Sequence, residues 1–176
     1  MNKIYAGIGS RETPVEILAI FEHLGFWLAR KGYTLRSGHA DGADMAFENG
    51  FHNANVSDTY AEIYIPWKGF NGSTSSYSSI SPEAEEMARR FHPAYSRLTQ
   101  GARKLQARNC YQVLGSDLNT PADFIVCWTP NGSGSGGTGQ AIRIANTYRI
   151  PVFDFGYWHN PDTAKQKFND FITTKL

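Results

Sequence analysis

Short apolar runs alternate along the chain with longer stretches whose apolar residues recur every three or four positions. The short runs have the length and the β-branched or aromatic content of buried strands. They cover Lys3–Ile8, Tyr33–Arg36, Ala61–Pro66, Asp123–Trp128 and Pro151–Phe155. The longer stretches have the period of helices, and they cover 14–28, 43–52, 82–91, 98–114, 138–148 and the segment from Pro161 onward.

This alternation of strands and helices is typical of βαβ units, which build open parallel sheets. The pattern therefore predicts an α/β, Rossmann-like protein with a mostly parallel central sheet of about five or more strands and helices on both faces. With 176 residues the chain can bury such a core, and we expect residues 1–176 to form one domain. Pro14 suits the first turn of the first helix, with Thr13 as its cap.

The composition is that of a folded, water-soluble protein. Hydrophobic residues make up 41% of the chain and charged residues 19%, which excludes a disordered sequence. The formal net charge of +1 gives no broad electrostatic footprint for duplex nucleic acid. The two cysteines form no disulfide framework, and we find neither a signal peptide nor an apolar stretch long enough to span a membrane. These features predict a cytoplasmic protein without a membrane partner.

Three strand-to-helix turns are rich in small residues. In a parallel sheet such turns gather at the carboxyl ends of the strands, where ligands bind. Helix N-termini offer free N–H groups and a positive dipole to an anion, and glycine removes the Cβ that would block contact. No Walker motif or dinucleotide fingerprint is present. The turns predict a phosphate site formed by Gly9, Ser10 and Arg11, by Ser37, Gly38 and Asp41, and by Gly136, Gly137, Thr138, Gly139 and Gln140.

The same three turns carry a resemblance to a known superfamily. The segments 5–14, 37–44 and 136–141 together resemble the SLOG superfamily. It joins the Rossmann-like domain of the DNA-processing protein A (DprA) family to the LOG nucleotide phosphoribohydrolases and to sensors of nucleotide-derived signals. The chain is most similar to the small DprA-like proteins of bacteria and phages. The resemblance, which spans Tyr5 to about Phe155, implies a SLOG-like nucleotide-binding domain.

Two departures from the family patterns bear on activity. Gly136-Gly137-Thr138 resembles the phosphate-holding motif of the LOG enzymes, which place a glutamate three residues after the threonine. This position is Ala141 here, and the neighbouring Gln140 cannot ionise, which favours binding over LOG-type hydrolysis. Segment 37–44 resembles the serine-glycine loop that the DprA family uses within a basic surface for single-stranded DNA. The composition does not indicate such a surface.

Three carboxylates are candidates for catalysis if the ligand is cleaved. Cleavage of an N-glycosidic bond needs a carboxylate near the sugar to stabilise oxocarbenium-like charge. Asp44 and Glu48 are spaced i and i+4 and share one helix face, and Glu12 follows the first glycine turn. Asp41 and Asp44 also suit the start of a helix for local reasons. The five histidines show no spacing of a known zinc motif, so we predict no intrinsic metal and no resident cofactor.

Aromatic and basic residues suggest further ligand contacts. Trp67 and Lys68 follow the third strand in a loop that could stack on a base, cover the core or form a subunit contact. Arg108 and Asn109 lie within a long helix, where Asn109 is a poor helix former. Both could bind phosphate. Similarity to family members also suggests a homo-oligomer.

The sequence leaves three functions open. The first is binding of a nucleotide or nucleotide-derived signalling molecule, for sensing or sequestration. The second is an N-glycosidase that acts on a nucleoside 5′-monophosphate. The third is DprA-like binding of single-stranded DNA, which near-neutral charge disfavours because such binding relies on phosphate neutralisation.

Overall fold

The computed structural model describes residues 3–175, and it is built around a five-stranded sheet. All four strand pairings are parallel and the order is β3-β2-β1-β4-β5. The strands are β1 (Ile4–Gly7), β2 (Thr34–Ser37), β3 (Ala61–Ile63), β4 (Phe124–Cys127) and β5 (Val152–Asp154). The predicted parallel, Rossmann-like α/β fold is confirmed.

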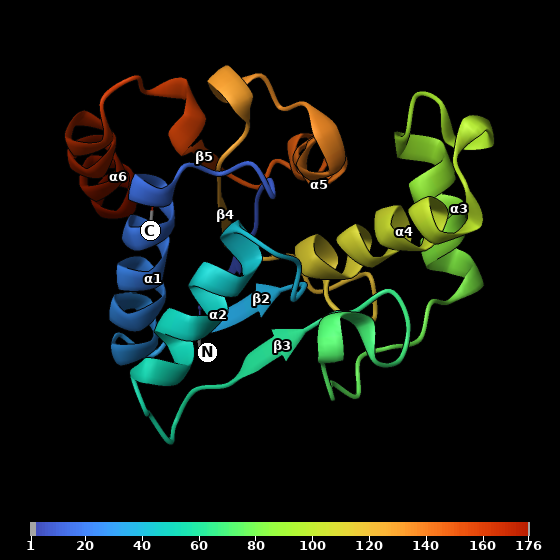
Figure 1. Cartoon of the computed structure of the whole chain (residues 1–176), viewed down its shortest axis with the longest axis horizontal. Helices are drawn as coiled ribbons and strands as arrows, with labels where there is room; N and C mark the ends of the chain where they lie inside the picture. The colour runs from blue at the N-terminus through green and yellow to red at the C-terminus, as the bar shows by residue number, and fades with distance from the viewer. Residues whose placement is uncertain (1–2, 176) are drawn as a thin grey trace.

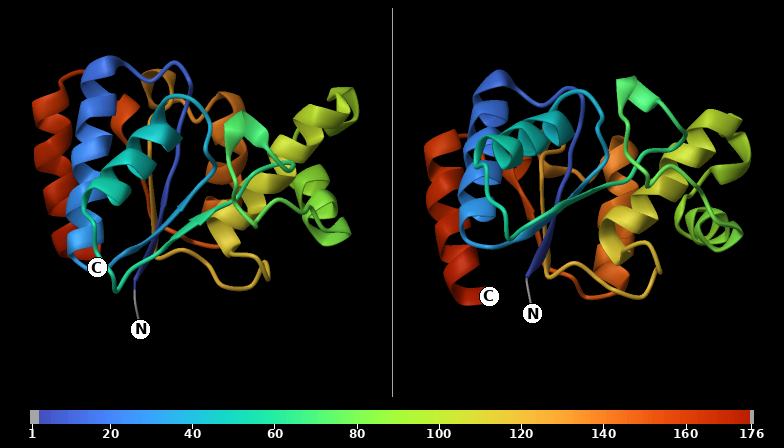
Figure 2. Two further views of the ribbon diagram at one scale, coloured as in Figure 1. Left: turned by 60° about the horizontal axis from the view of Figure 1, so that its bottom comes forward. Right: turned by 90° about the horizontal axis from the view of Figure 1, so that it is seen from below.

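Six helices cover the two faces of this sheet within residues 3–175. Helices α1 (Val15–Arg30), α2 (Ala43–Asn53) and α6 (Pro161–Lys175) lie on one face, and α3 (Pro82–Phe91), α4 (Gln100–Leu114) and α5 (Gly136–Thr147) lie on the other (Figures 1 and 2). Each face has its own apolar cluster, because neighbouring strand residues point to opposite sides. Tyr5 packs under α1 and α2, whereas Ala6 packs under α4 and α5. Short 3₁₀ helices lie at η1 (Phe70–Gly72), η2 (Tyr95–Arg97), η3 (Pro130–Gly132) and η4 (Phe155–Tyr157).

The strand order places a switch point in the middle of the sheet. Chain connections run outward from β1 to β2 and β3 on one side, and to β4 and β5 on the other. Tyr5 pairs with Leu35 on one side and with Phe124 on the other. In open parallel sheets the crevice above such a switch point is the usual ligand position. The turns after β1 and β4 therefore border the region where a ligand is expected.

Several predicted boundaries were wrong by one to three residues. Thr13 does not cap α1, because its Oγ1 donates a hydrogen bond to Ser10 O (2.6 Å) and Pro14 occupies the cap position. Helix α4 begins at Gln100 rather than Leu98, since Thr99 Oγ1 accepts the N–H of Ala102 (3.2 Å). Four of the five strands are shorter than predicted, and β2 keeps its predicted length but begins and ends one residue later.

The start of α5 differs in a way that matters for ligand binding. The helix begins at Gly136, two residues earlier than predicted. Gly136 and Gly137 therefore form its first turn, so their N–H groups belong to the unpaired amides with which a helix starts.

Among residues 3–175, none of the helices has both the length and the apolar character that a membrane span requires.

Candidate functional site

A polar cavity of about 460 Å³ lies at the carboxyl edge of the sheet, between the β1 turn and the start of α5. It brings together residues from all three predicted glycine segments, with Ala40 and Asp44 contributed by segment 37–44. One wall is a face of α4. Asp44, near the start of α2, forms another part of the wall. The lining residues are Ile8, Gly9, Ser10, Arg11, Glu12, Ala40, Asp44, Leu105, Gln106, Arg108, Asn109, Gln112, Pro130, Ser135, Gly136, Gly137 and Thr138.

The backbone amides of the β1 turn are largely used within the protein. The N–H of Ile8 donates to Val126 O (3.1 Å), and that of Ser10 donates to Trp128 O (3.2 Å). The N–H of Gly9 donates to the carboxylate of Asp44. The Ser10 hydroxyl accepts the N–H of Glu12 (3.0 Å). This turn therefore offers a ligand few free N–H donors. Its small side chains still allow a ligand to approach the backbone closely.

The β2 turn is filled by side chains of the protein itself. Ser37 Oγ donates to Gly7 O (2.6 Å) and is buried. A Cβ on Gly38 would lie 2.1 Å from Arg108 Nη1, and Gly38 O accepts a hydrogen bond from that guanidinium. Gly38 is thus required for close packing of α4 against the turn. Neither Ser37 nor Gly38 lines the cavity, whereas Ala40 and Asp44 of the same segment do.

The first turn of α5 is the open one. A Cβ on Gly136 or Gly137 would find no neighbouring atom within 4 Å, and both residues line the cavity. Ser135 occupies the cap position without a side-chain hydrogen bond to the helix. The amides of this turn therefore face the cavity without a cap, as an anion site requires.

Two sets of hydrogen bonds hold this turn in place. Asn109 Nδ2 of α4 donates to Gly137 O (2.9 Å). Asp154, at the end of β5, accepts the N–H of Thr129 (2.9 Å) and also the Thr129 hydroxyl. Thr129 Oγ1 in turn accepts the N–H of Gly134 (2.9 Å). The loop before α5 is therefore fixed at both ends, so that its amides are organised before a ligand arrives.

Arg108 places a buried cation at the wall of the cavity. Besides Gly38 O, its guanidinium contacts Tyr64 O (3.2 Å) and lies over the ring of Phe70 (5.8 Å). Burial lowers the pKa of Arg108, but Asp44 acts in the opposite direction, and an arginine stays charged in proteins. The positive charge lies at the α4 wall of the cavity, against the β2 turn, where it favours a bound anion.

Gln112 adds an unused hydrogen-bonding group to the same wall. The residue is only 2% exposed and lines the cavity. Among residues 3–175, no group pairs with its Nε2 atom, nor with Oε1 of the nearby Gln106. Buried polar groups normally have partners. A ligand in this cavity, with rotation of the amides, would supply them.

Asp44 is a buried carboxylate with a perturbed pKa. It is 3% exposed, and burial raises its pKa from 3.8 to about 6, opposed by Arg108 and by the backbone N–H groups of Ala40 and Gly9. The folded chain therefore holds a proton on Asp44 more tightly than the unfolded chain does. The stabilising contribution is complete below about pH 4 and is lost as the pH rises through about 6.

Asp44→Asn tests this linkage. Between pH 4 and pH 7 we expect the free energy of unfolding of the native chain to fall by about 2 kcal/mol relative to the variant. Chemical denaturation at a series of pH values measures both curves, and the difference removes the effects of the other carboxylates. Parallel curves would show that Asp44 titrates normally.

The other predicted carboxylates lie in different surroundings. Glu48 shares the α2 face with Asp44 but pairs with His39 Nδ1 (2.8 Å) and His52 Nε2 (3.7 Å), and it does not line the cavity. Glu12 is exposed at the cavity rim beside Arg11. Asp41 is exposed and lies outside the lining. Asp44 is therefore the buried carboxylate that faces the ligand space.

Gln140 and Gly139 serve packing rather than the cavity. Gln140 is fully buried, with Nε2 donating to Ala88 O (3.0 Å) and Oε1 accepting from Arg143 (2.9 Å). Both ends of its amide are engaged within the protein, so Gln140, which was predicted to contact the ligand, does not line the cavity. A Cβ on Gly139 would lie 2.1 Å from Gly134 O, so this glycine is required by the turn.

The predicted stacking loop also lies outside the cavity lining. Trp67 and Lys68 are exposed, and the Trp67 ring packs edge-on against Phe70 (5.3 Å between centroids). The tip of the loop is tied to the β2 turn, because Asn71 Nδ2 donates to His39 O (3.1 Å). Neither Trp67 nor Lys68 contributes to the cavity walls.

Sequence reasoning named Arg108 and Asn109 but missed the rest of the α4 wall. Leu105, Gln106 and Gln112 also face the cavity. The available signal was the spacing of Arg108, Asn109 and Gln112, which places three polar side chains on one face of a helix. All three are buried, and burial of that polar face could not be seen in the sequence.

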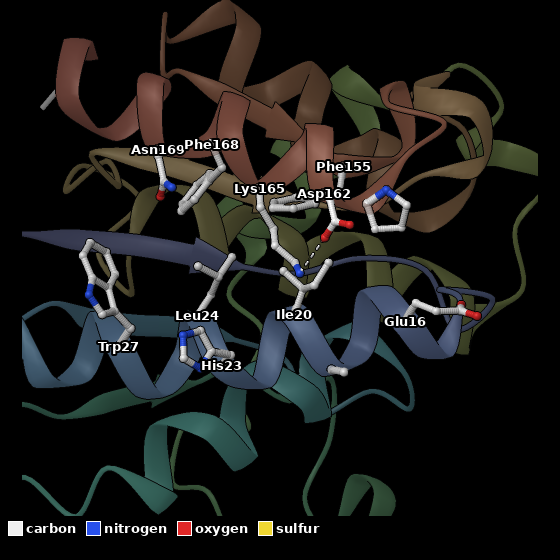
Figure 3. Close-up of a pocket in the computed structure, with 12 residues that line it drawn as sticks. Glu16, Ile20, His23, Leu24, Trp27, Phe155, Asp162, Lys165, Phe168 and Asn169 are labelled. Carbon is white, nitrogen blue, oxygen red and sulfur yellow. Dashed lines mark hydrogen bonds and ion pairs between the residues drawn. The ribbon is translucent and has the colours of Figure 1, made fainter.

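A larger cavity of about 640 Å³ separates α1 from α6 (Figure 3). Its base is apolar, with Ile20, Leu24 and Phe168. The charged pair at its rim, Asp162 and Lys165, is already joined (3.0 Å). This cavity does not adjoin the glycine turns, so we take the smaller polar cavity as the candidate site.

The metal-ligating side chains and the two thiols of the described part of the chain lie apart from one another or are buried. Within residues 3–175, no group of three or more His, Cys, Asp or Glu side chains is arranged to hold a metal ion. Cys110 and Cys127 are buried and unpaired. Burial raises the pKa of the Cys110 thiol to about 12, which makes it a poor nucleophile.

Comparison with known proteins gives likeness of fold. No family model matches the chain, and no curated protein does. Among solved structures, TM1055, a target of the Northeast Structural Genomics Consortium, is 23% identical with a TM-score of 0.51, over 86% of this chain and 72% of that one. The chain is thus a Rossmann-like α/β protein with a polar cavity at the carboxyl edge of its sheet.

Two further structures have a similar fold. DNA processing protein A from Helicobacter pylori, described as binding single-stranded DNA, is 20% identical with a TM-score of 0.54, and the match covers 86% of this chain but 64% of that one. The Moco carrier protein of Chlamydomonas rheinhardtii is 15% identical with a TM-score of 0.53, over 97% and 84% of the two chains. At these identities the likeness extends to the Rossmann-like fold alone.

Proposed function

We propose that the chain binds a nucleotide or nucleotide-derived molecule by holding its phosphate on the first turn of α5. The observation that carries this proposal is the contrast among the three glycine turns. The β1 turn uses the amides of Ile8 and Ser10 internally and the β2 turn is packed against Arg108 at Gly38, whereas Gly136 and Gly137 present an uncapped helix start to the cavity. A helix N-terminus with glycine in its first turn suits a phosphate.

The α4 wall of the cavity supports a ligand larger than phosphate. Arg108, Asn109 and Gln112 line a space of about 460 Å³, which is within the range of small-molecule sites. The Nε2 atom of Gln112, for which residues 3–175 supply no hydrogen-bond partner, and the carboxylate of Asp44 offer hydrogen bonds to a sugar or a base. One structural neighbour binds single-stranded DNA, which is itself built of nucleotides.

Thermal unfolding with a ligand panel tests the proposal. The panel contains nucleoside monophosphates, cyclic nucleotides, ADP-ribose and inorganic phosphate. A ligand that binds only the folded chain stabilises it by about 2.7 kcal/mol at a hundredfold excess over its dissociation constant. We expect stabilisation by at least one nucleotide beyond that given by phosphate. No stabilisation by any member, together with no nucleotide released on denaturing the purified protein, would contradict the proposal.

A second candidate function is cleavage of the N-glycosidic bond of a nucleoside 5′-monophosphate. The observation that favours it is Asp44, a buried cavity carboxylate whose pKa is raised to about 6, suited to acid or base chemistry near neutral pH. The position of the LOG glutamate is the fully buried Ala141. Release of free base from any nucleotide, abolished in Asp44→Asn, would establish cleavage; intact ligand after long incubation would leave binding alone.

A further inference from the structure

Asp44 occupies a position in which a bound anion would be expected. Its carboxylate accepts N–H groups from two turns at once, Ala40 in the β2 turn (3.4 Å) and Gly9 in the β1 turn. It also lies in the field of the buried Arg108 guanidinium. Two backbone amides and an arginine are the partners with which proteins hold a phosphate oxygen.

A local role in starting α2 does not account for these bonds. Gly42 is the cap residue of α2, and Asp44 is the second residue of the helix. A capping side chain accepts N–H groups from its own first turn. Asp44 instead accepts from residues before the helix and from a different strand turn. Its contacts join the two sides of the cavity rather than completing the helix.

We propose that Asp44 is an internal anion that fills the second anion position of the cavity and so restricts the site to ligands that place one anionic group there. This inference rests on the proposed function, which assigns the first anion position to Gly136 and Gly137. Asp44 lines the same cavity as Gly136 and Gly137, so a second phosphate held inside that cavity would meet the Asp44 carboxylate. Like charges at a desolvated contact strongly disfavour binding.

The charges around Asp44 strengthen this selection. Arg108 of α4 is the cation that acts on it directly, while Glu48 of the same helix adds negative charge. Arg11 and Glu12 lie at the exposed rim and oppose one another in charge. His39 of the β2 turn is engaged by Glu48. The buried charges of the site are therefore one cation, Arg108, and one anion, Asp44. A bound ligand with one phosphate adds a single further negative charge to this pair.

Asp44→Ser is expected to improve the binding of ligands with two phosphates. The short hydroxyl leaves the amides of Gly9 and Ala40 and the guanidinium of Arg108 open to a ligand. By isothermal titration calorimetry, we expect the native chain to bind nucleoside monophosphates at least about tenfold more tightly than the matching diphosphates. In Asp44→Ser we expect that preference to vanish or reverse. Phosphate and pyrophosphate give the same comparison without a base.

Two further variants keep the test independent of folding. Asp44→Asn retains an acceptor of the same shape and removes the charge, so it carries the test if Asp44→Ser does not fold, with a preference reduced at least about threefold. Asp44→Glu retains the charge, and a preserved preference for one phosphate is expected. Thermal unfolding of each free variant confirms that it is folded.

The outcomes separate the inference from the proposed function. Equal binding of mono- and diphosphates by the native chain, or an unchanged preference in the serine and asparagine variants, would overturn the role of Asp44 and leave nucleotide binding in place. Failure of the native chain to bind any nucleotide or phosphate would remove the proposed function, and the inference with it.

Discussion

Gly137→Asp is expected to abolish ligand binding while leaving the protein folded. Gly137 is the second residue of α5, and a Cβ there meets no atom within 4 Å. A carboxylate at this position is favourable to the helix by about 0.5 kcal/mol, but it places a negative charge where the phosphate would lie. We expect the affinity for a nucleotide to fall at least about a hundredfold, with an unchanged or slightly raised Tm.

Gly101 supplies the matched control. It is the second residue of α4, its Cβ would meet only the Trp67 ring at 3.9 Å, and it does not line the cavity. Gly101→Asp should therefore leave nucleotide affinity unchanged. Gly137→Val should resemble Gly137→Asp, because its side chain blocks the approach without adding charge. Normal binding by Gly137→Val would place the phosphate elsewhere.

Gly50→Ala is expected to cause the largest loss of stability. Helices α1 and α2 approach closely, and a Cβ on Gly50 would lie 1.9 Å from Glu22 O and 2.9 Å from Phe26 N. These are backbone atoms, which cannot rotate away, so the two helices must separate. Overpacking of this kind costs about 3 kcal/mol, which corresponds to a fall in Tm of about 10 °C.

The same substitution at Gly101 separates the clash from the helix propensity of alanine. Gly101→Ala introduces no short contact and is expected to change stability by less than about 1 kcal/mol, in the stabilising direction. Thermal and urea unfolding of both variants measure the difference. Equal stability of Gly50→Ala and Gly101→Ala would show that α1 and α2 do not pack as closely as described.

The fold followed from the pattern of the chain because each strand is a short apolar run and each helix has an amphipathic period. The runs at Tyr5 and Phe124 became adjacent central strands, as their apolar character on both faces requires. The ends of elements were less predictable. Thr13 and Thr99 both precede helices, yet only Thr99 caps one, since tertiary contacts decide where a hydroxyl points.

The three glycine turns could be located from the sequence, but their availability could not. Whether an amide is free depends on residues far away in the chain. Val126 and Trp128 take up the amides of the β1 turn, and Arg108 fills the space at Gly38. Only the folded arrangement shows that the α5 turn is left open.

The candidate side chains divide for a similar reason. Asp44 and Glu48 lie one helical turn apart, so the spacing made them equivalent, yet Asp44 reaches the cavity and Glu48 pairs with His39. Gln140 lies four residues beyond Gly136, but the rotation of α5 directs it toward α3. The phase of a helix relative to a cavity is set by packing, which a single sequence does not reveal.

Amide chemical shifts of the isotope-labelled protein test the central claim most directly. On titration with a nucleoside monophosphate, an anion held by the start of α5 should produce the largest changes at the N–H groups of Gly136, Gly137 and Thr138, with smaller changes along the α4 wall. Unperturbed signals there, with the main changes at residues between α1 and α6 such as His23 and Asn169, would show that the ligand binds the other cavity and that the α5 turn holds no phosphate.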